Sequence, residues 1–350
     1  MKRIVSALII AVCAVSGWGR IPASLLPTEK EKTAMAREAD DFIDAINDGR
    51  QDRQADAILH AMRGQGGELA ALRQSRNTPA KVSDNVTTQT IQGTGAARGV
   101  AMKLFRPKKA TGKKLPLLVY FHGGGWTIGS INSCSRFCDA LAATGKVMVL
   151  AVDYALAPEK PYPAGLMDCV AATEFAMANA VKWGSAPSLV SLGGDSSGGN
   201  LAISTAMYLD GGAGKAGAKG VVKPKSLVLF YPVVKAYADN SASWKRYKRG
   251  YGLDRRLMET FNEAYLGGGD SKDPLVSPSE ASAAKLSKLP PILLVAAEKD
   301  ILADQGKDFT AKVKGAQRIE LPGTVHLFIT VPGQETAFRK AVAVTSEFLK

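Results

Sequence analysis

The sequence predicts a doubly wound α/β fold, in which helices cover both faces of a mostly parallel β-sheet. From about residue 117 to the C-terminus, short apolar runs rich in Val, Leu and Ile alternate with longer segments of helical period. Continuous apolar runs of this kind are typical of strands that are buried on both faces. The composition agrees, because 46% hydrophobic and 22% charged residues over 350 positions are ordinary for a globular protein with a sizeable core.

The first 17 residues have the pattern of a secretory signal peptide. Lys2 and Arg3 precede an uncharged run over 4–15, and the small residues Ser16 and Gly17 follow it, which favours cleavage after one of these two. The apolar run is shorter than the roughly 20 residues of a membrane-spanning helix. We therefore expect a secreted or periplasmic protein with no integral membrane span after processing. A permanent membrane anchor is the second choice.

Residues 18–83 are expected to form a helical N-terminal segment. Thr28 and Glu31 have the spacing of a capping box, and Phe42 and Ile46 recur at a helical interval in a stretch rich in Ala, Asp, Glu and Arg that runs to about residue 63. Beyond residue 84 the apolar period changes to two. This change predicts strands over 86–91 and 100–104.

Strands and helices are then expected to alternate over 84–350. The apolar runs predict strands at 117–121, 147–152, 189–192, 227–231, 292–296 and 318–321, and the segments between them predict helices near 132–144, 164–182, 198–210, 302–314 and 334–349. The Gly-, Lys- and Ala-rich stretch 211–223 is interpreted as an exposed loop. Residues 233–268 break the alternation with polar, basic and aromatic side chains, so we interpret them as an insertion over one end of the sheet.

Charge and cysteine content exclude several classes of protein. The net charge is +13, but no nucleic-acid recognition motif accompanies it, and nucleic-acid binding conflicts with secretion. Four cysteines in 350 residues are too few for a disulfide scaffold, and no C-x-x-C pair suggests a zinc site. Cys134, Cys138 and Cys169, which remain after removal of the signal peptide, are interpreted as buried thiols. We expect no metal.

Residues 194–198, Gly-Asp-Ser-Ser-Gly, match the G-x-S-x-G pattern of a nucleophilic serine. The pattern alone is weak, but here it follows an apolar run and precedes a helix-compatible segment. A strand, a tight turn and a helix are what a nucleophile elbow requires, because the turn lifts the serine hydroxyl clear of the sheet. Ser196 is therefore the predicted nucleophile. A phosphate-binding turn is the alternative, but the Gly and Lys spacing of a P-loop is absent.

A glycine run supplies the second part of a catalytic site. His122-Gly123-Gly124-Gly125-Trp126 follows the predicted strand 117–121. Acyl transfer needs hydrogen-bond donors aimed at the oxygen that becomes negative in the tetrahedral intermediate. The amides of Gly124 and Gly125, with that of Ser197 after the nucleophile, would form such an oxyanion hole. A merely flexible loop is the alternative.

The catalytic base is chosen by elimination among the three histidines. His60 lies in the N-terminal helical segment, and His122 is interpreted as fixing the glycine loop by hydrogen bonding. His326 follows the last predicted strand, at the edge where such sheets place their sites. The acid that orients it is expected after the strand at 292–296, where Asp300 is preferred and Glu298 and Asp304 are substitutes.

These motifs together resemble the hormone-sensitive-lipase-like family of α/β-hydrolase esterases. Residues 122–126 match its HGGG segment, 194–200 its GDSAGG segment and 153–159 its DYxLAPE stretch, while Asp273-Pro274 with Ser277-Pro278 resembles DPxxSP. Asp300 stands where the family has its DPL segment. Ser197 replaces the commoner alanine, Ile301 replaces the proline after the acid, and a signal peptide is unusual for the group.

The resemblance spans residues 85–350 and implies an α/β-hydrolase fold with a cap built from the N-terminal helices and the 233–268 insertion. It implies catalysis by Ser196, Asp300 and His326, with Gly124, Gly125 and Ser197 as the oxyanion hole. Trp126, Trp244 and Tyr247 are the candidate contacts to substrate or cap.

The expected function is serine-dependent hydrolysis of carboxylic esters through an acyl-enzyme, without metal or cofactor. A carboxylesterase for short acyl chains is preferred, acting on a small-molecule or polymer-attached ester. A carbohydrate deacetylase or another polymer-directed esterase is the alternative. A receptor without hydrolytic activity is disfavoured, because the chain has a candidate for each member of the triad. The sequence does not predict the oligomeric state.

Overall fold

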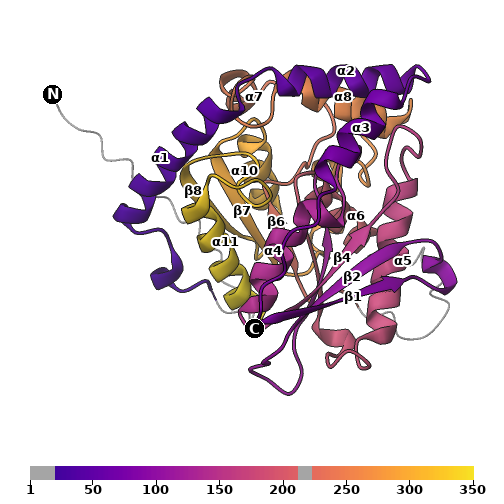
Figure 1. Ribbon diagram of the computed structural model, residues 1–350, viewed down its shortest axis with the longest axis vertical. Helices are drawn as coiled ribbons and strands as arrows, with labels where there is room; N and C mark the ends of the chain where they lie inside the picture. The colour runs from indigo at the N-terminus through magenta and orange to yellow at the C-terminus, as the bar shows by residue number, and fades with distance from the viewer. Residues whose placement is uncertain (1–19, 212–222) are drawn as a thin grey trace.

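The computed structural model describes residues 20–211 and 223–350 (Figure 1). The predicted signal peptide and nearly all of the predicted loop at 211–223 lie outside the described residues. Within the described part of the chain, no helix has the length and apolar character to cross a bilayer.

One sheet of eight strands forms the centre of the molecule, in the order β1-β2-β4-β3-β5-β6-β7-β8. The strands β1 and β2 pair antiparallel with each other, β2 pairs antiparallel with β4, and all other pairs are parallel. The strands are β1 Val86–Gln92, β2 Ala101–Pro107, β3 Leu117–Phe121, β4 Met148–Asp153, β5 Val190–Asp195, β6 Leu227–Phe230, β7 Ile292–Lys299 and β8 Gln317–Val325.

Helices cover both faces of this sheet. Side chains alternate between the faces, so that Leu118 and Tyr120 of β3 pack with α4 and α11, while Val119 of β3 packs with α5, α6 and α10. This burial on both faces explains the continuous apolar runs of the sequence. The covering helices are α4 Ile131–Ala143, α11 Glu335–Phe348, α5 Ala164–Asn179, α6 Ser197–Asp210 and α10 Ala303–Lys312.

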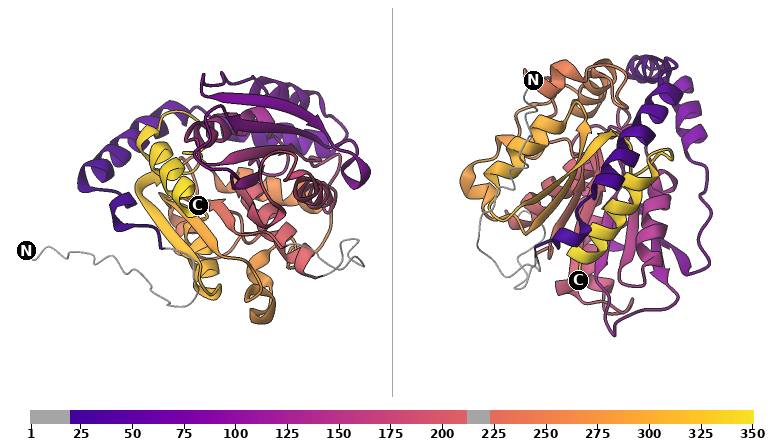
Figure 2. Two further views of the ribbon diagram at one scale, coloured as in Figure 1. Left: turned by 90° about the horizontal axis from the view of Figure 1, so that it is seen from below. Right: turned by 90° about the vertical axis from the view of Figure 1, so that its left-hand side faces the viewer.

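The remaining helices lie over the carboxyl ends of the strands and along one edge of the sheet. Helix α2 (Arg50–Met62) lies beside α8 (Arg255–Leu266) at the top of Figure 1, although some 200 residues separate them. Helix α3 (Gly67–Arg76) packs on α2. Helix α1 (Glu29–Ile46) runs along β8 and α11 (Figure 2). Two short helices complete the set, α7 (Ala242–Arg246) and α9 (Ala283–Leu286).

The structure differs from the sequence-based expectations at three places. The helical segment expected over 18–83 is divided into separate helices: it is broken at Gly49, which has φ +76°, and α3 lies beyond residue 63, where the stretch with the clearest helical pattern was expected to end. Strand β7 extends beyond the predicted range 292–296 to Lys299, so that Asp300 directly follows the strand. Strand β8 continues through Pro322 to Val325, where a loop was expected, because an edge strand tolerates a proline that has no N–H to donate.

Candidate active site

The parallel strands bring the predicted catalytic residues to one edge of the sheet. Ser196 follows β5, and His326 follows β8, while the glycine run begins directly after β3. Because β3, β5, β6, β7 and β8 are neighbours with the same direction, their carboxyl ends meet at one edge. Active sites of open α/β sheets lie at this edge.

Three side chains that are far apart in sequence form one hydrogen-bonded chain. The Ser196 hydroxyl lies 3.2 Å from His326 Nε2, and His326 Nδ1 lies 2.7 Å from Asp300 Oδ2. Ser196 is 7% exposed, while Asp300 and His326 are each 1% exposed. With Nδ1 donating to the carboxylate, Nε2 is free to accept the serine proton, which is the arrangement that activates a serine nucleophile.

The backbone at Ser196 has the conformation of a nucleophile elbow. Its φ and ψ are 53° and −117°, which an L-residue rarely adopts. The strained turn is fixed on both sides, since the Ser196 amide donates to the Phe230 carbonyl and its own carbonyl accepts from Val233. A Cβ at Gly198 would lie 1.9 Å from the Phe121 carbonyl oxygen. Only glycine therefore fits at that position of the motif.

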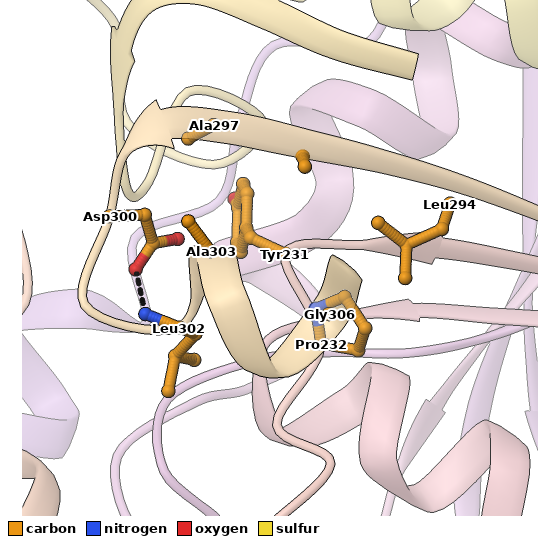
Figure 3. A pocket seen from close by; sticks show the side chains of 9 residues that line it. Tyr231, Pro232, Leu294, Ala297, Asp300, Leu302, Ala303 and Gly306 are labelled. Carbon is orange, nitrogen blue, oxygen red and sulfur yellow. Dashed lines mark hydrogen bonds between the residues drawn. The ribbon is translucent and has the colours of Figure 1, made fainter. Parts of the chain in front are cut away.

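A bulge in the sheet places the acid beside the base. The pairing of β7 with β8 shifts between Ala297 and Lys299, and Lys299 then pairs with Val325. Asp300 and His326 are the next residues of the two strands, so they leave the sheet side by side. The second oxygen of Asp300 accepts from the Leu302 amide at 3.0 Å, beside a small cavity (Figure 3).

The two substitutes considered for the acid have other partners. Glu298 accepts a hydrogen bond from the Gly323 amide at 2.6 Å. Asp304 accepts from the Ser243 amide at 2.8 Å. Neither carboxylate is hydrogen-bonded to His326, so the geometry favours Asp300.

The glycine loop after β3 turns its backbone sharply beside Ser196. Gly124 and Gly125 have φ of +112° and +58°. The amides of both donate to no acceptor within the described residues, and the Ser197 amide is at the first position of α6, where no intrahelical partner exists. Unpaired amides at a helix start and in a tight turn suit a developing negative charge. The three predicted donors are thus available, and their catalytic role remains a prediction.

His122 supports the loop and takes no part in the triad's hydrogen bonds. Its Nδ1 donates to the Gly123 carbonyl at 2.8 Å, and its ring stacks on Tyr154 at a centroid distance of 4.3 Å. Burial lowers the pKa of His122 below its ordinary value, which keeps the ring neutral. This arrangement agrees with the expectation that His122 fixes the loop.

The predicted cap segments lie directly on the site. A Cβ at Gly125 would be 2.1 Å from the Phe261 ring of α8, and a Cβ at Gly252 would be 2.9 Å from the His326 carbonyl oxygen. Trp126 stacks on Tyr265 of α8 with a centroid distance of 4.2 Å. The other candidate contacts, Trp244 and Tyr247, are buried, and no contact shown here assigns them to a substrate.

Sequence reasoning missed four side chains that contact the triad or the segments beside it. Tyr231, just after β6, packs its ring 4.3 Å from that of His326. Asp195 accepts hydrogen bonds from the Tyr120 hydroxyl and the Gly123 amide. Phe261 covers Gly125, and Arg73 of α3 binds the backbone after the glycine loop. The position of Asp195 inside the serine motif was the only feature of the sequence that could have indicated it. The other three side chains make contacts with residues far away in the sequence, which no local pattern indicates.

Comparison with known proteins identifies relatives of this chain. A family model described as alpha/beta hydrolase fold matches residues 118–330. The carboxylesterase NlhH of Mycobacterium tuberculosis is 30% identical over 293 residues, which cover 80% of this chain and 88% of NlhH. The carboxylic ester hydrolase LipN of the same organism is 34% identical over 225 residues, which cover 63% of this chain and only 58% of LipN.

Solved structures agree with these sequence matches. The crystal structure of carboxyl esterase 2 from the mycorrhizal fungus Tuber melanosporum superposes with a TM-score of 0.68 at 28% identity, covering 78% of this chain and 89% of that one. An alpha/beta hydrolase enzyme from the metagenome of Lake Arreo superposes with a TM-score of 0.70 at 27% identity, covering 89% of this chain and 98% of that one.

Proposed function

The chain belongs to the alpha/beta hydrolase fold family of hormone-sensitive-lipase-like esterases, and from this premise we propose that it hydrolyses carboxylic esters with Ser196 as the nucleophile. The observation that carries the proposal is the buried chain of hydrogen bonds from Ser196 through His326 to Asp300. It lies beside the unpaired amides of the glycine loop. Relatives named as carboxylic ester hydrolases support the same reaction class.

The reaction proceeds in two halves at this site. His326 Nε2 takes the hydroxyl proton of Ser196 as the oxygen attacks the ester carbonyl, and the carbonyl oxygen becomes negative beside the amides of Gly124, Gly125 and Ser197. His326 returns the proton to the leaving alcohol, and an acyl-enzyme remains. Water, deprotonated by the same nitrogen, then attacks the acyl carbon; the bond from that carbon to the Ser196 oxygen breaks, the acid leaves, and His326 returns the proton to the serine oxygen. Asp300 holds the ring and stabilises its charged form throughout.

Replacement of the nucleophile tests this proposal. With p-nitrophenyl acetate as substrate, we expect Ser196→Ala to reduce kcat by about 10⁴-fold or more. The matched control is Ser197→Ala, which removes a neighbouring hydroxyl but keeps the backbone amide, and it should retain most of the activity. If Ser196→Ala keeps a tenth of the activity of the unaltered enzyme, the proposed nucleophile is wrong.

A preference for short acyl chains is the finer part of the proposal. Phe261 is buried against Gly125, and the cap loop at Gly252 packs on His326, and we infer from these two contacts that the acyl site is narrow. We expect kcat/KM to fall steadily from acetyl to decanoyl esters. Phe261→Ala should raise the decanoyl-to-acetyl ratio about tenfold or more, because a long chain gains the vacated volume.

The matched control is Phe175→Ala on α5, where the ring packs on Trp183 instead. Its chain-length profile should equal that of the unaltered enzyme. Acetylated sugars belong in the same panel. Higher kcat/KM on them than on simple acetyl esters would favour the polymer-directed alternative.

Export of the protein is also part of the proposal, on the basis of the signal-like residues 1–17. Mass spectrometry of the protein secreted or exported by its native host should show a start near Gly17 or Trp18. A protein that keeps Met1 and stays in the cytoplasm would contradict it.

A further inference from the structure

One arginine of the N-terminal segment binds three residues in two separate segments of the catalytic domain. Arg73 of α3 donates from Nε to the Thr127 carbonyl at 2.7 Å and from Nη2 to the Ala157 carbonyl at 2.7 Å. Its Nη1 and Nη2 also bind the two carboxylate oxygens of Glu159, each at 2.8 Å. Bidentate arginine–carboxylate pairs fix geometry better than single contacts. The guanidinium is therefore held in one orientation.

The two carbonyls that Arg73 binds belong to the segments that shape the glycine loop. The Thr127 amide donates to the Gly124 carbonyl at 3.0 Å, which closes the turn containing Gly124 and Gly125. The Ala157 amide donates to the Trp126 carbonyl at 3.0 Å. Arg73 is therefore connected to the turn by two routes, each with one residue between: Thr127 on the first route and Ala157 on the second.

Apolar packing of α3 does not account for the contacts of Arg73. Leu69 is the only fully buried side chain of the helix, whereas Thr127 is completely buried. A carbonyl that loses its partner in such a place costs free energy, and the loop would move to recover a hydrogen bond. A displacement of about 1 Å of groups that serve the transition state can cost a hundredfold in rate.

We propose that Arg73 is a positioning residue, which holds the amides of Gly124 and Gly125 at the oxyanion through Thr127 and Ala157. The inference rests on the proposed ester hydrolysis. If this is so, the packing of the N-terminal helix α3 on the catalytic domain determines how well the transition state is stabilised. Substrate binding in the ground state is not expected to depend on this contact.

The test combines steady-state kinetics with a trifluoromethyl ketone, to whose carbonyl carbon the Ser196 oxygen adds. The carbonyl electron pair moves to its oxygen, and the serine proton passes to His326, so the adduct carries the oxyanion. We expect Arg73→Ala to lower kcat about tenfold to a hundredfold with KM within about threefold. The inhibition constant of the ketone should rise by the same factor as kcat/KM falls.

Two further variants and a control sharpen the result. Arg73→Lys keeps the charge but cannot bind all three partners, so its kcat should be intermediate, and Glu159→Gln should lose less than Arg73→Ala because both carbonyl contacts remain. Arg63→Ala, which removes a positive charge from the exposed end of α2, should behave as the unaltered enzyme. If Arg73→Ala does not fold, Arg73→Lys decides the question.

The outcomes separate this inference from the proposed function. An inactive unaltered enzyme would refute ester hydrolysis itself. If the unaltered enzyme is active, two results would refute the positioning role. The first is that the Arg73 variants keep the kcat of the unaltered enzyme per titrated active site. The second is that they lose activity through a higher KM, with no change in the inhibition constant of the ketone.

Discussion

A buried carboxyl group lies immediately before the nucleophile and connects two catalytic segments. Asp195 Oδ1 accepts from the Tyr120 hydroxyl at 2.9 Å and from the Gly123 amide at 3.0 Å. Burial raises the pKa of Asp195 to about 6, although both hydrogen bonds act to lower it. Desolvation of the charged form therefore outweighs the hydrogen bonds.

This pKa predicts how stability changes with pH. The folded protein keeps the Asp195 proton up to about pH 6, while the unfolded chain releases it near its ordinary value of 3.8. The contribution of Asp195 to stability is therefore complete below the unfolded value and is lost as the pH rises through 6. A shift of about 2 pKa units corresponds to about 3 kcal/mol of unfolding free energy.

Asp195→Asn isolates this effect, because an amide oxygen still accepts from both donors but does not titrate. Urea unfolding of both proteins from pH 4 to 8 should show the enzyme losing stability relative to the variant as pH rises, with a plateau above about pH 7. Effects of other carboxyl groups cancel in the difference. A difference that is flat, or that grows in favour of Asp195 with rising pH, would contradict the prediction.

The sequence was sufficient to predict Ser196 and His326 as partners, since a motif selected one and elimination among three histidines selected the other. It favoured Asp300 but left Glu298 and Asp304 as substitutes, because the bulge between β7 and β8 that aligns Asp300 with His326 has no local signature. Tyr231, whose ring packs on His326, could not be predicted either, because no local sequence pattern indicates this contact.

At the scale of elements, continuous apolar strands were predictable, and elements held by tertiary contacts were not. The range 117–121 agrees with β3, and most other strands differ from their predicted ends by a few residues. Helix α3, with a single buried residue, lacks the apolar period that would reveal it. The end of β8 contains Pro322 and Gly323, which are typical of turns, and contacts with α1 keep it extended.

The contact of α1 with β8 gives a prediction at this scale. A Cβ at Gly323, which has φ +75°, would lie 2.6 Å from Ala36 Cα. Gly323→Ala combines a strained backbone, worth roughly 1–2 kcal/mol, with a clash that costs roughly 1–3 kcal/mol more. Gly64→Ala is the matched control, because its φ of +83° is similar and no atom lies within 4 Å of the added Cβ.

Denaturant unfolding measures both variants. Gly64→Ala should lower the free energy of unfolding only by the cost of the strained backbone, and Gly323→Ala should lower it distinctly more. Equal losses of unfolding free energy in the two variants would mean that α1 shifts away from the added Cβ without a loss of stability. Helix α1 would then not hold the end of β8 that leads to His326.

At the scale of the whole molecule, the cap is one charged layer made from two distant segments. Arg249 pairs with Asp52 at 3.0 Å, and Arg256 pairs with Asp52 and Asp56. The Asp254 amide donates to Gln51 Oε1. Exposed ion pairs of this kind contribute little each, so the layer is held mainly by packing of α2 on α8.

The chain carries a net charge of +13, and part of it lies in this layer. Lys245, Arg246 and Lys248 are exposed and immediately precede the loop that contacts His326. A positive field near an active site raises the local concentration of anionic substrates. We therefore expect kcat/KM for an anionic ester, such as a p-nitrophenyl succinate monoester, to fall several-fold between 0.1 M and 1 M salt, as the Debye length shrinks from about 10 Å to about 3 Å.

Charge reversal separates a local field from the net charge. Replacing Lys245, Arg246 and Lys248 by Glu should lower kcat/KM for the anionic ester at low salt and leave a neutral ester unchanged. The matched control reverses Lys108, Lys109 and Lys113, which are exposed in the loop before β3 and thus at the opposite edge of the sheet. It makes the same change in net charge but at the end of the sheet away from Ser196, where salt screens its field at the active site more strongly, so its effect on kcat/KM should be small. If both triple variants lose the same activity, or if the neutral ester responds equally, these side chains serve only as a solvated surface.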